Sequence, residues 1–120
     1  MDEISAGYAK IGRFTKDAGV KRITEIAMKK YVIEREIPGA GKMSLDQIQT
    51  VARRSVNVLA GLGVEIQWVE SYVTGDKIYC VYLATDAELI REHGRLTGIP
   101  CNSIVEVAHV IDPTLAEAAV

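Results

Sequence analysis

The stretch EIQWVESYVTGDKIYCVYLA, residues 65–84, holds two runs of strand-forming residues separated by a short turn. Valine, isoleucine, tyrosine and tryptophan are enriched in strands, and a Gly-Asp pair between two such runs is typical of a tight hairpin. We therefore predict strands over residues 65–73 and 77–84. Thr74-Gly75-Asp76 joins them, and we expect the Gly-Asp pair to supply the positive φ that such a turn needs.

Upstream of this hairpin the sequence predicts a strand followed by a helix. Residues 31–37 are rich in β-formers and stop at Pro38-Gly39. Ser44 and Gln47 have the spacing of a capping box, in which each side chain bonds the backbone of the other. Apolar residues at helical spacing then continue as far as Gly61 and Gly63, which predicts a long amphipathic helix.

Downstream of the hairpin the same two elements recur in the order helix, strand. Thr85-Asp86-Ala87-Glu88 has the pattern of a second capping box, and it predicts a helix through about Leu96 that ends at Gly98. Residues 103–111 then form the last predicted strand, which stops at Asp112-Pro113.

The predicted order of elements is β-α-β-β-α-β, the split βαβ motif. Right-handed crossovers put both helices on one face of the sheet. We therefore predict an α+β fold of the ferredoxin-like kind, with a four-stranded antiparallel sheet and two helices on one face. The chain divides into an N-terminal extension (1–28, with a helix at 17–27), the ferredoxin-like domain (29–113) and a C-terminal tail (114–120).

Bulk properties exclude several functional classes. The chain has 120 residues and a net charge of −2, which fits one domain and argues against a nucleic-acid partner. No apolar run approaches the roughly 20 residues of a membrane span, and the N-terminus lacks a signal-peptide core. Cys80 and Cys101 form no C-x-x-C pair. We therefore expect a cytoplasmic protein that binds neither nucleic acid nor membrane.

The sheet face away from the helices is predicted to be too apolar to remain exposed to solvent. Strand residues alternate between faces, yet neither set is polar in most strands. If Ile33, Val69, Val81 and Val107 meet the helices, five other residues line the open face. These are Trp68, Tyr72, Cys80, Tyr82 and Ile104. The expected cover is a second copy in a two-fold homodimer through Trp68, Tyr72 and Tyr82. The alternative is that the first 28 residues fold over this face.

Two carboxylates, Glu34 and Glu106, are expected on the same open face, on neighbouring strands. A carboxylate among apolar and aromatic side chains needs a cation, a proton or water to balance its charge. The two residues therefore mark either a solvated rim or a functional pocket, and the sequence leaves both readings open.

The chain also contains donors that transition metals accept. His93, His109, Cys80, Cys101 and the two carboxylates offer the nitrogen, sulfur and oxygen ligands of nickel, copper or zinc. No pair has a diagnostic spacing. The simpler interpretation of His93 is a packed helix residue, and that of Cys80 is a small packed strand residue.

Several segments together resemble a small bacterial family of ferredoxin-like domains, most of them of unknown function. Its characterised example is a nickel-binding, nickel-responsive protein. The segments that carry the resemblance are residues 31–35, 68–73, 77–82, 90–93, 98–100, 104–107 and 112–113. The resemblance covers residues 29–113 and implies a dimer that binds nickel or another divalent transition metal. By their positions in these segments, it implies Glu34, Cys80, His93 and Glu106 as candidate metal ligands.

We therefore expect a transition-metal-binding or metal-responsive protein of the nickel type. Two alternatives stay open, and with them the question whether the protein is an enzyme. The first is a cofactor-free oxygenase or isomerase of the dimeric α+β type, with a carboxylate or His93 as base; this rests on analogy of fold alone. The second is a non-catalytic module for dimerisation or partner binding.

Overall fold

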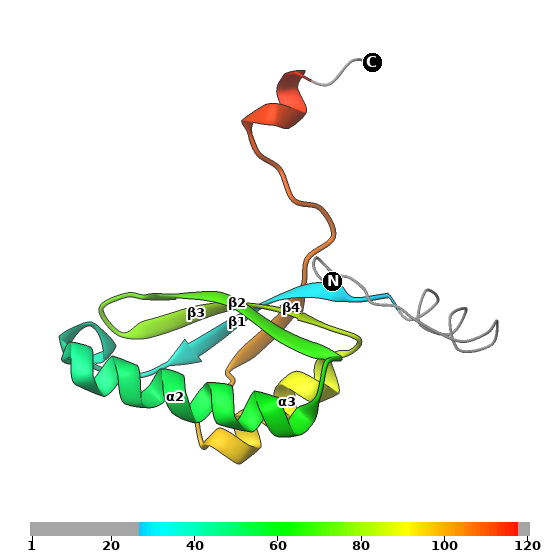
Figure 1. Ribbon diagram of the computed structural model, residues 1–120. Helices are drawn as coiled ribbons and strands as arrows, with labels where there is room; N and C mark the ends of the chain where they lie inside the picture. Colours follow the sequence, from blue (N-terminus) through cyan, green and yellow to red (C-terminus); the bar gives the residue numbers. More distant parts are fainter. Residues whose placement is uncertain (1–26, 118–120) are drawn as a thin grey trace.

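The computed structural model describes residues 27–117, in which the elements follow the predicted order (Figure 1). These elements are β1 (Lys29–Glu36), the 3-10 helix η1 (Ala40–Lys42), α2 (Leu45–Leu62), β2 (Ile66–Val73), β3 (Lys77–Ala84), α3 (Ala87–Thr97), β4 (Ser103–Glu106) and the 3-10 helix η2 (Pro113–Glu117). The strands form one antiparallel sheet in the order β2-β3-β1-β4, with α2 and α3 on one face. The predicted α+β sandwich is confirmed. The helix expected at 17–27 lies outside the described residues, save for its last position.

The ends of α2 are formed as the sequence predicts. The Gln47 amide donates to Ser44 Oγ at 3.1 Å, and the Ser44 amide donates to Gln47 Oε1 at 2.8 Å. Gly63 ends the helix with a φ of 95°, a conformation that side chains with a Cβ rarely adopt. The capping box and the glycine stop are both confirmed.

The start of α3 differs from the prediction. Its cap is Asp86, whose carboxylate accepts from the amides of Glu88 and Leu89, and Thr85 makes no capping box. Aspartate is a strong cap because an ionised oxygen satisfies the free amides of the first turn. The predicted stop is confirmed, since Gly98 ends the helix in the left-handed region at φ 76°.

The hairpin turn between β2 and β3 is held by Thr74 rather than by a glycine at positive φ. Positive φ occurs at Gly39, Gly63 and Gly98 but not at Gly75, so the glycine of the Gly-Asp pair does not supply the conformation predicted for the pair. Thr74 Oγ1 accepts from the Lys77 amide at 3.1 Å and donates to the Lys77 carbonyl at 2.9 Å. A threonine side chain thereby substitutes for the glycine conformation.

The turn also packs against η1. The Gly41 amide donates to the Gly75 carbonyl at 2.9 Å. A Cβ at Gly41 would lie 2.8 Å from the Thr74 carbonyl oxygen. The backbones of η1 and the hairpin turn therefore approach so closely that only glycine fits at position 41.

Cross-strand register shows which side chains face the helices. In β1, Tyr31, Ile33 and Arg35 are buried and Val32 is exposed. Ile33 pairs with Cys80 on one side and Ile104 on the other, and directly paired residues share a face. Cys80 and Ile104 therefore face the helices, as does Tyr82 opposite Tyr31. The prediction that these three residues line the open face was wrong. Both alternating sets are apolar, so alternation alone could not choose between them.

A bulge in β2 places Trp68 and Tyr72 on opposite faces. Trp68 pairs with Tyr82 on the helix side, the register shifts between Trp68 and Glu70, and Tyr72 then pairs with Tyr79 on the open side. A bulge adds one residue to one strand and reverses the alternation beyond it. The prediction that both aromatic residues share the open face was therefore wrong for Trp68.

The last strand is shorter than predicted. β4 ends at Glu106 instead of residue 111, after which the Val107 amide still donates to the Lys30 carbonyl at 2.8 Å. Residues 108–117, which we call the C-terminal arm, then rise from the sheet on the side opposite the helices (Figure 1). The arm exposes Val110, Ile111 and Leu115. No helix within residues 27–117 is long and apolar enough to cross a membrane.

Candidate functional site

The structure separates the four predicted metal ligands. Glu34 lies on the open face, where its carboxylate is 2.6 Å from Lys77 Nζ. Glu106 pairs with Tyr31, so it lies on the opposite face at the exposed end of β4. The two carboxylates are on neighbouring strands, as predicted, but the expectation that they share a face was wrong. Cys80 and His93 are both buried, Cys80 on the helix side of the sheet and His93 on α3.

Within one chain these residues do not fit a nickel site. Among residues 27–117, no three His, Cys, Asp or Glu side chains gather in a way that could hold a metal ion. Cys80 instead receives a hydrogen bond from Arg35, whose positive charge opposes a metal dication beside the sulfur. The four metal ligands implied by the resemblance therefore remain a prediction, and the described residues of one chain do not bring them together.

The same region contains a buried arginine. Arg35 is only 2% exposed. Its Nε donates to Cys80 Sγ at 3.2 Å, and its Nη1 donates to the Pro100 carbonyl at 3.1 Å and to Cys101 Sγ at 3.3 Å. In the described part of the chain no carboxylate lies within ion-pair distance of it. Arg35 is thus a buried cation whose acceptors are two cysteine sulfurs and a backbone carbonyl, which is unusual because burying a charge without an ion-pair partner is costly.

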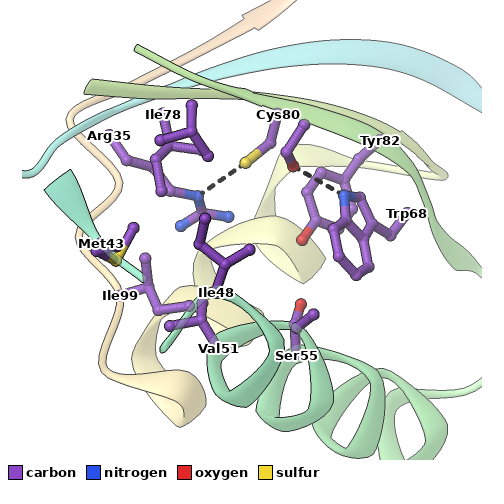
Figure 2. Close-up of a pocket in the computed structure, with 13 residues that line it drawn as sticks. Arg35, Met43, Ile48, Val51, Ser55, Trp68, Ile78, Cys80, Tyr82 and Ile99 are labelled. Carbon is purple, nitrogen blue, oxygen red and sulfur yellow. Dashed lines mark hydrogen bonds between the residues drawn. The ribbon is translucent and has the colours of Figure 1, made fainter. Parts of the chain in front are cut away.

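A cavity of about 80 Å³ lies beside this guanidinium, between α2 and the sheet (Figure 2). Its walls are largely apolar, with polar groups from Arg35, Ser55, Ser71 and Tyr82. The full lining is Arg35, Met43, Ile48, Val51, Ala52, Ser55, Trp68, Ser71, Val73, Ile78, Cys80, Tyr82 and Ile99. Figure 2 shows the guanidinium between Cys80 on the sheet and Ile48 on α2. This arrangement can hold a small group with a negative charge.

A second polar cluster joins the helices to the sheet beside that cavity. His93 has no exposed surface, its Nε2 lies 2.9 Å from Ser55 Oγ, and its ring centroid is 5.4 Å from that of Tyr82. Burial and the nearby charge of Arg35 lower the pKa of His93 to about 4. Burial also raises the pKa of Tyr82. At neutral pH both side chains are uncharged, so Arg35 is the cation of the cluster.

Arg35 was not singled out from the sequence, although a signal for it exists. It stands in the row Tyr31, Ile33, Arg35, Ile37, whose other members are apolar. An arginine in the core-facing row of a central strand predicts a buried charge, and a buried charge predicts a partner.

Comparison with known proteins identifies the family of the chain. No curated protein matches the chain. Among solved structures, the chain is similar to the crystal structure of SCO4226 from Streptomyces coelicolor A3(2), with a TM-score of 0.59 and 15% sequence identity. The match covers 68% of this chain and 99% of that one, and at this identity it shows the fold alone. Residues 31–107, more than half of the chain, match the family described as nickel responsive protein SCO4226-like. The chain therefore belongs to the SCO4226-like family of nickel responsive proteins.

Proposed function

We propose that the protein binds a transition metal of the nickel type, as a homodimer whose metal is held between the two copies. The observation that carries the proposal is the family match over residues 31–107, since the family is described as nickel responsive. The structure contributes the argument for two copies, and it narrows the candidate ligands.

Two apolar surfaces support a second copy as partner. The open sheet face exposes Val32, Tyr72 and Val105, at 36%, 51% and 56%. The C-terminal arm stands clear of the sheet and exposes Val110, Ile111 and Leu115. Both surfaces lie on the same side of the molecule, so a two-fold partner can cover the face and the arm together. Trp68 and Tyr82, expected in the interface, are instead part of the interior.

The accessible donors point to a metal site shared between chains. Cys80 and His93 are enclosed, whereas Glu106 and His109 are exposed at the end of β4 and the start of the arm. Nickel accepts both imidazole and carboxylate ligands. The described residues of one chain do not gather three donors, and Glu106 lies on the edge strand β4, so we assign the remaining ligands to a second chain that approaches this edge.

The test is a nickel titration of tag-free protein by calorimetry, with the molar mass followed by light scattering. We expect a dissociation constant below ~100 μM, and a loss of at least ~10-fold in affinity in Glu106→Gln and in His109→Ala. Glu65→Gln, which changes another exposed carboxylate, is the matched control and should bind as the parent does. Binding weaker than this limit, or equal binding by all three variants, would refute the proposal.

The oxygenase or isomerase alternative receives no support from the geometry. The cavity between α2 and the sheet, at about 80 Å³, is well below the roughly 300 Å³ at which small-molecule sites begin. A larger hollow of about 420 Å³ beside Arg91, Arg95 and Cys101 is an open surface depression, and neither His93 nor a carboxylate lines it. His93, the expected base, is fully buried and hydrogen-bonded to Ser55.

A further inference from the structure

The guanidinium of Arg35 has hydrogen-bond capacity left over. A guanidinium carries five N–H groups. The bonds to Cys80, Pro100 and Cys101 use the one on Nε and the two on Nη1. Within residues 27–117 the two N–H groups on Nη2 make no hydrogen bond that meets normal geometry. The side chain is 2% exposed and lines the cavity. Among residues 27–117 Nη2 is not one of the fully enclosed side-chain atoms without a partner, so these N–H groups keep the small accessible surface through which a bound group can reach them.

We propose that this cavity is a binding site for a small monovalent oxyanion of the carboxylate class, such as formate, acetate or bicarbonate. One oxygen accepts from Nη2 of Arg35 and so balances the buried positive charge. Charge-assisted bonds of this kind are about twice as strong as neutral ones. The hydroxyl of Tyr82, which also lines the cavity, is available to donate to the other oxygen. The hydroxyl of Ser55 is available as well in the tautomer in which His93 Nε2 carries the proton and donates to Ser55 Oγ.

The size of the cavity selects the class of anion. An engineered apolar cavity of about 150 Å³ takes benzene, which has six heavy atoms. A cavity of about 80 Å³ therefore suits three or four heavy atoms, the size of formate, acetate or bicarbonate. Sulfate and phosphate are larger and carry about two charges, which one guanidinium among apolar walls does not balance. The methyl group of acetate matches the walls formed by Ile48 and Val51.

Trp68 provides the readout for the test. It is the only tryptophan of the chain and it lines the cavity. Sodium formate, acetate and bicarbonate are titrated separately into metal-free protein, with sodium chloride keeping the ionic strength constant. We expect a saturable change in Trp68 fluorescence with a dissociation constant below ~10 mM. The thermal midpoint should rise over the same concentration range.

Two variants and one control separate the site from other effects. Arg35→Met removes the charge and should weaken binding by at least ~10-fold. Ala52→Leu keeps the guanidinium but fills the cavity, so it decides the matter if Arg35→Met does not fold. Arg53→Met, at an exposed position of α2, should bind as the parent does.

Two results would overturn the inference. The first is a response to formate, acetate and bicarbonate no larger than the response to chloride, and the second is saturable binding that persists in Ala52→Leu. Since the cavity takes no part in the proposed metal site, neither of these results bears on nickel binding.

Discussion

The Nε–H of Arg35 donates a hydrogen bond to Cys80 Sγ at 3.2 Å. This bond joins the central strand β1 to its neighbour β3 and lies in the buried layer between the sheet and the helices. The sulfur that the resemblance implies as a metal ligand is thus the acceptor of a fixed positive charge. A dication at the same sulfur would be repelled, because two positive charges at this distance interact strongly away from water. The interior of this protein is built to receive a negative group.

The first prediction concerns the stability cost of this arginine. Arg35→Met keeps the unbranched stem of the side chain and removes the guanidinium with its unpaired buried charge. The hydrogen bonds that are lost are offset because the charge no longer has to be removed from water. In chloride buffer we expect the free energy of unfolding to change by less than ~1 kcal/mol. Urea denaturation measures this, and a loss above ~3 kcal/mol would show that Arg35 is needed for folding itself.

The second prediction concerns pH and His93. Its pKa in the folded protein is about 4, below the ordinary value of 6.5, so the unfolded chain binds the proton first. Stability is therefore fully present above pH 6.5 and falls as the pH drops from 6.5 towards 4. The loss at the acid end is on the order of 3 kcal/mol, from a shift of about two and a half pKa units.

Denaturation of His93→Gln between pH 4 and 7 isolates this contribution. The variant should be less stable than the parent at pH 7, and the difference should shrink as the pH falls. His109→Gln, at an exposed position, is the matched control and should be as stable as the parent at pH 7. A constant difference between His93→Gln and the parent would contradict the assignment.

The third prediction concerns the contact between η1 and the hairpin turn. Gly41→Ala places a Cβ 2.8 Å from the Thr74 carbonyl oxygen and 3.1 Å from the Gly75 Cα. Both neighbours are backbone, so we expect a loss of about 1–3 kcal/mol in the free energy of unfolding. Gly61→Ala is the matched control, since a Cβ there meets nothing and alanine favours the helix by about 1 kcal/mol. Equal melting temperatures for the two variants would contradict the close approach.

The fourth prediction concerns the C-terminal arm. Ile111→Asp and Leu115→Asp each put a charge on an apolar side chain that the proposed dimer covers. We expect the parent protein to have the mass of two chains by light scattering and both variants to have the mass of one. Val64→Asp, at a position 82% exposed between α2 and β2, should stay dimeric. A parent protein with the mass of one chain would remove this explanation of the open face.

Much of the fold could be predicted because its signals are local. Ser44 with Gln47 and the glycines after each helix act within a few residues, and they give the element order directly. The faces of the sheet could not be predicted, because they depend on register. Only the pairing of Ile33 with Cys80 shows that the cysteine is inside, and both rows of β3 are apolar.

The candidate site was harder to predict for a related reason. The sequence suggested donors by their chemical type, and two of them, Glu34 and Glu106, lie on opposite faces of adjacent strands. Arg35 escaped notice because an arginine on a strand is usually a surface residue. Its burial follows from the row it shares with Tyr31 and Ile33, which register alone fixes.

The bulge in β2 has a consequence for how this sheet can change over time. One extra residue between Trp68 and Glu70 decides that the tryptophan points inward and Tyr72 outward. Deletion of a single codon at Val69 would remove the extra residue and leave Glu70 opposite Val81 and Tyr72 opposite Tyr79, so every side chain beyond it would keep its face. If Val69 were instead part of plain alternation, Trp68 and Tyr72, four residues apart, would share one face. The bulge therefore lets the strand gain or lose one residue without exchanging the side chains that line the cavity with those that form the partner surface.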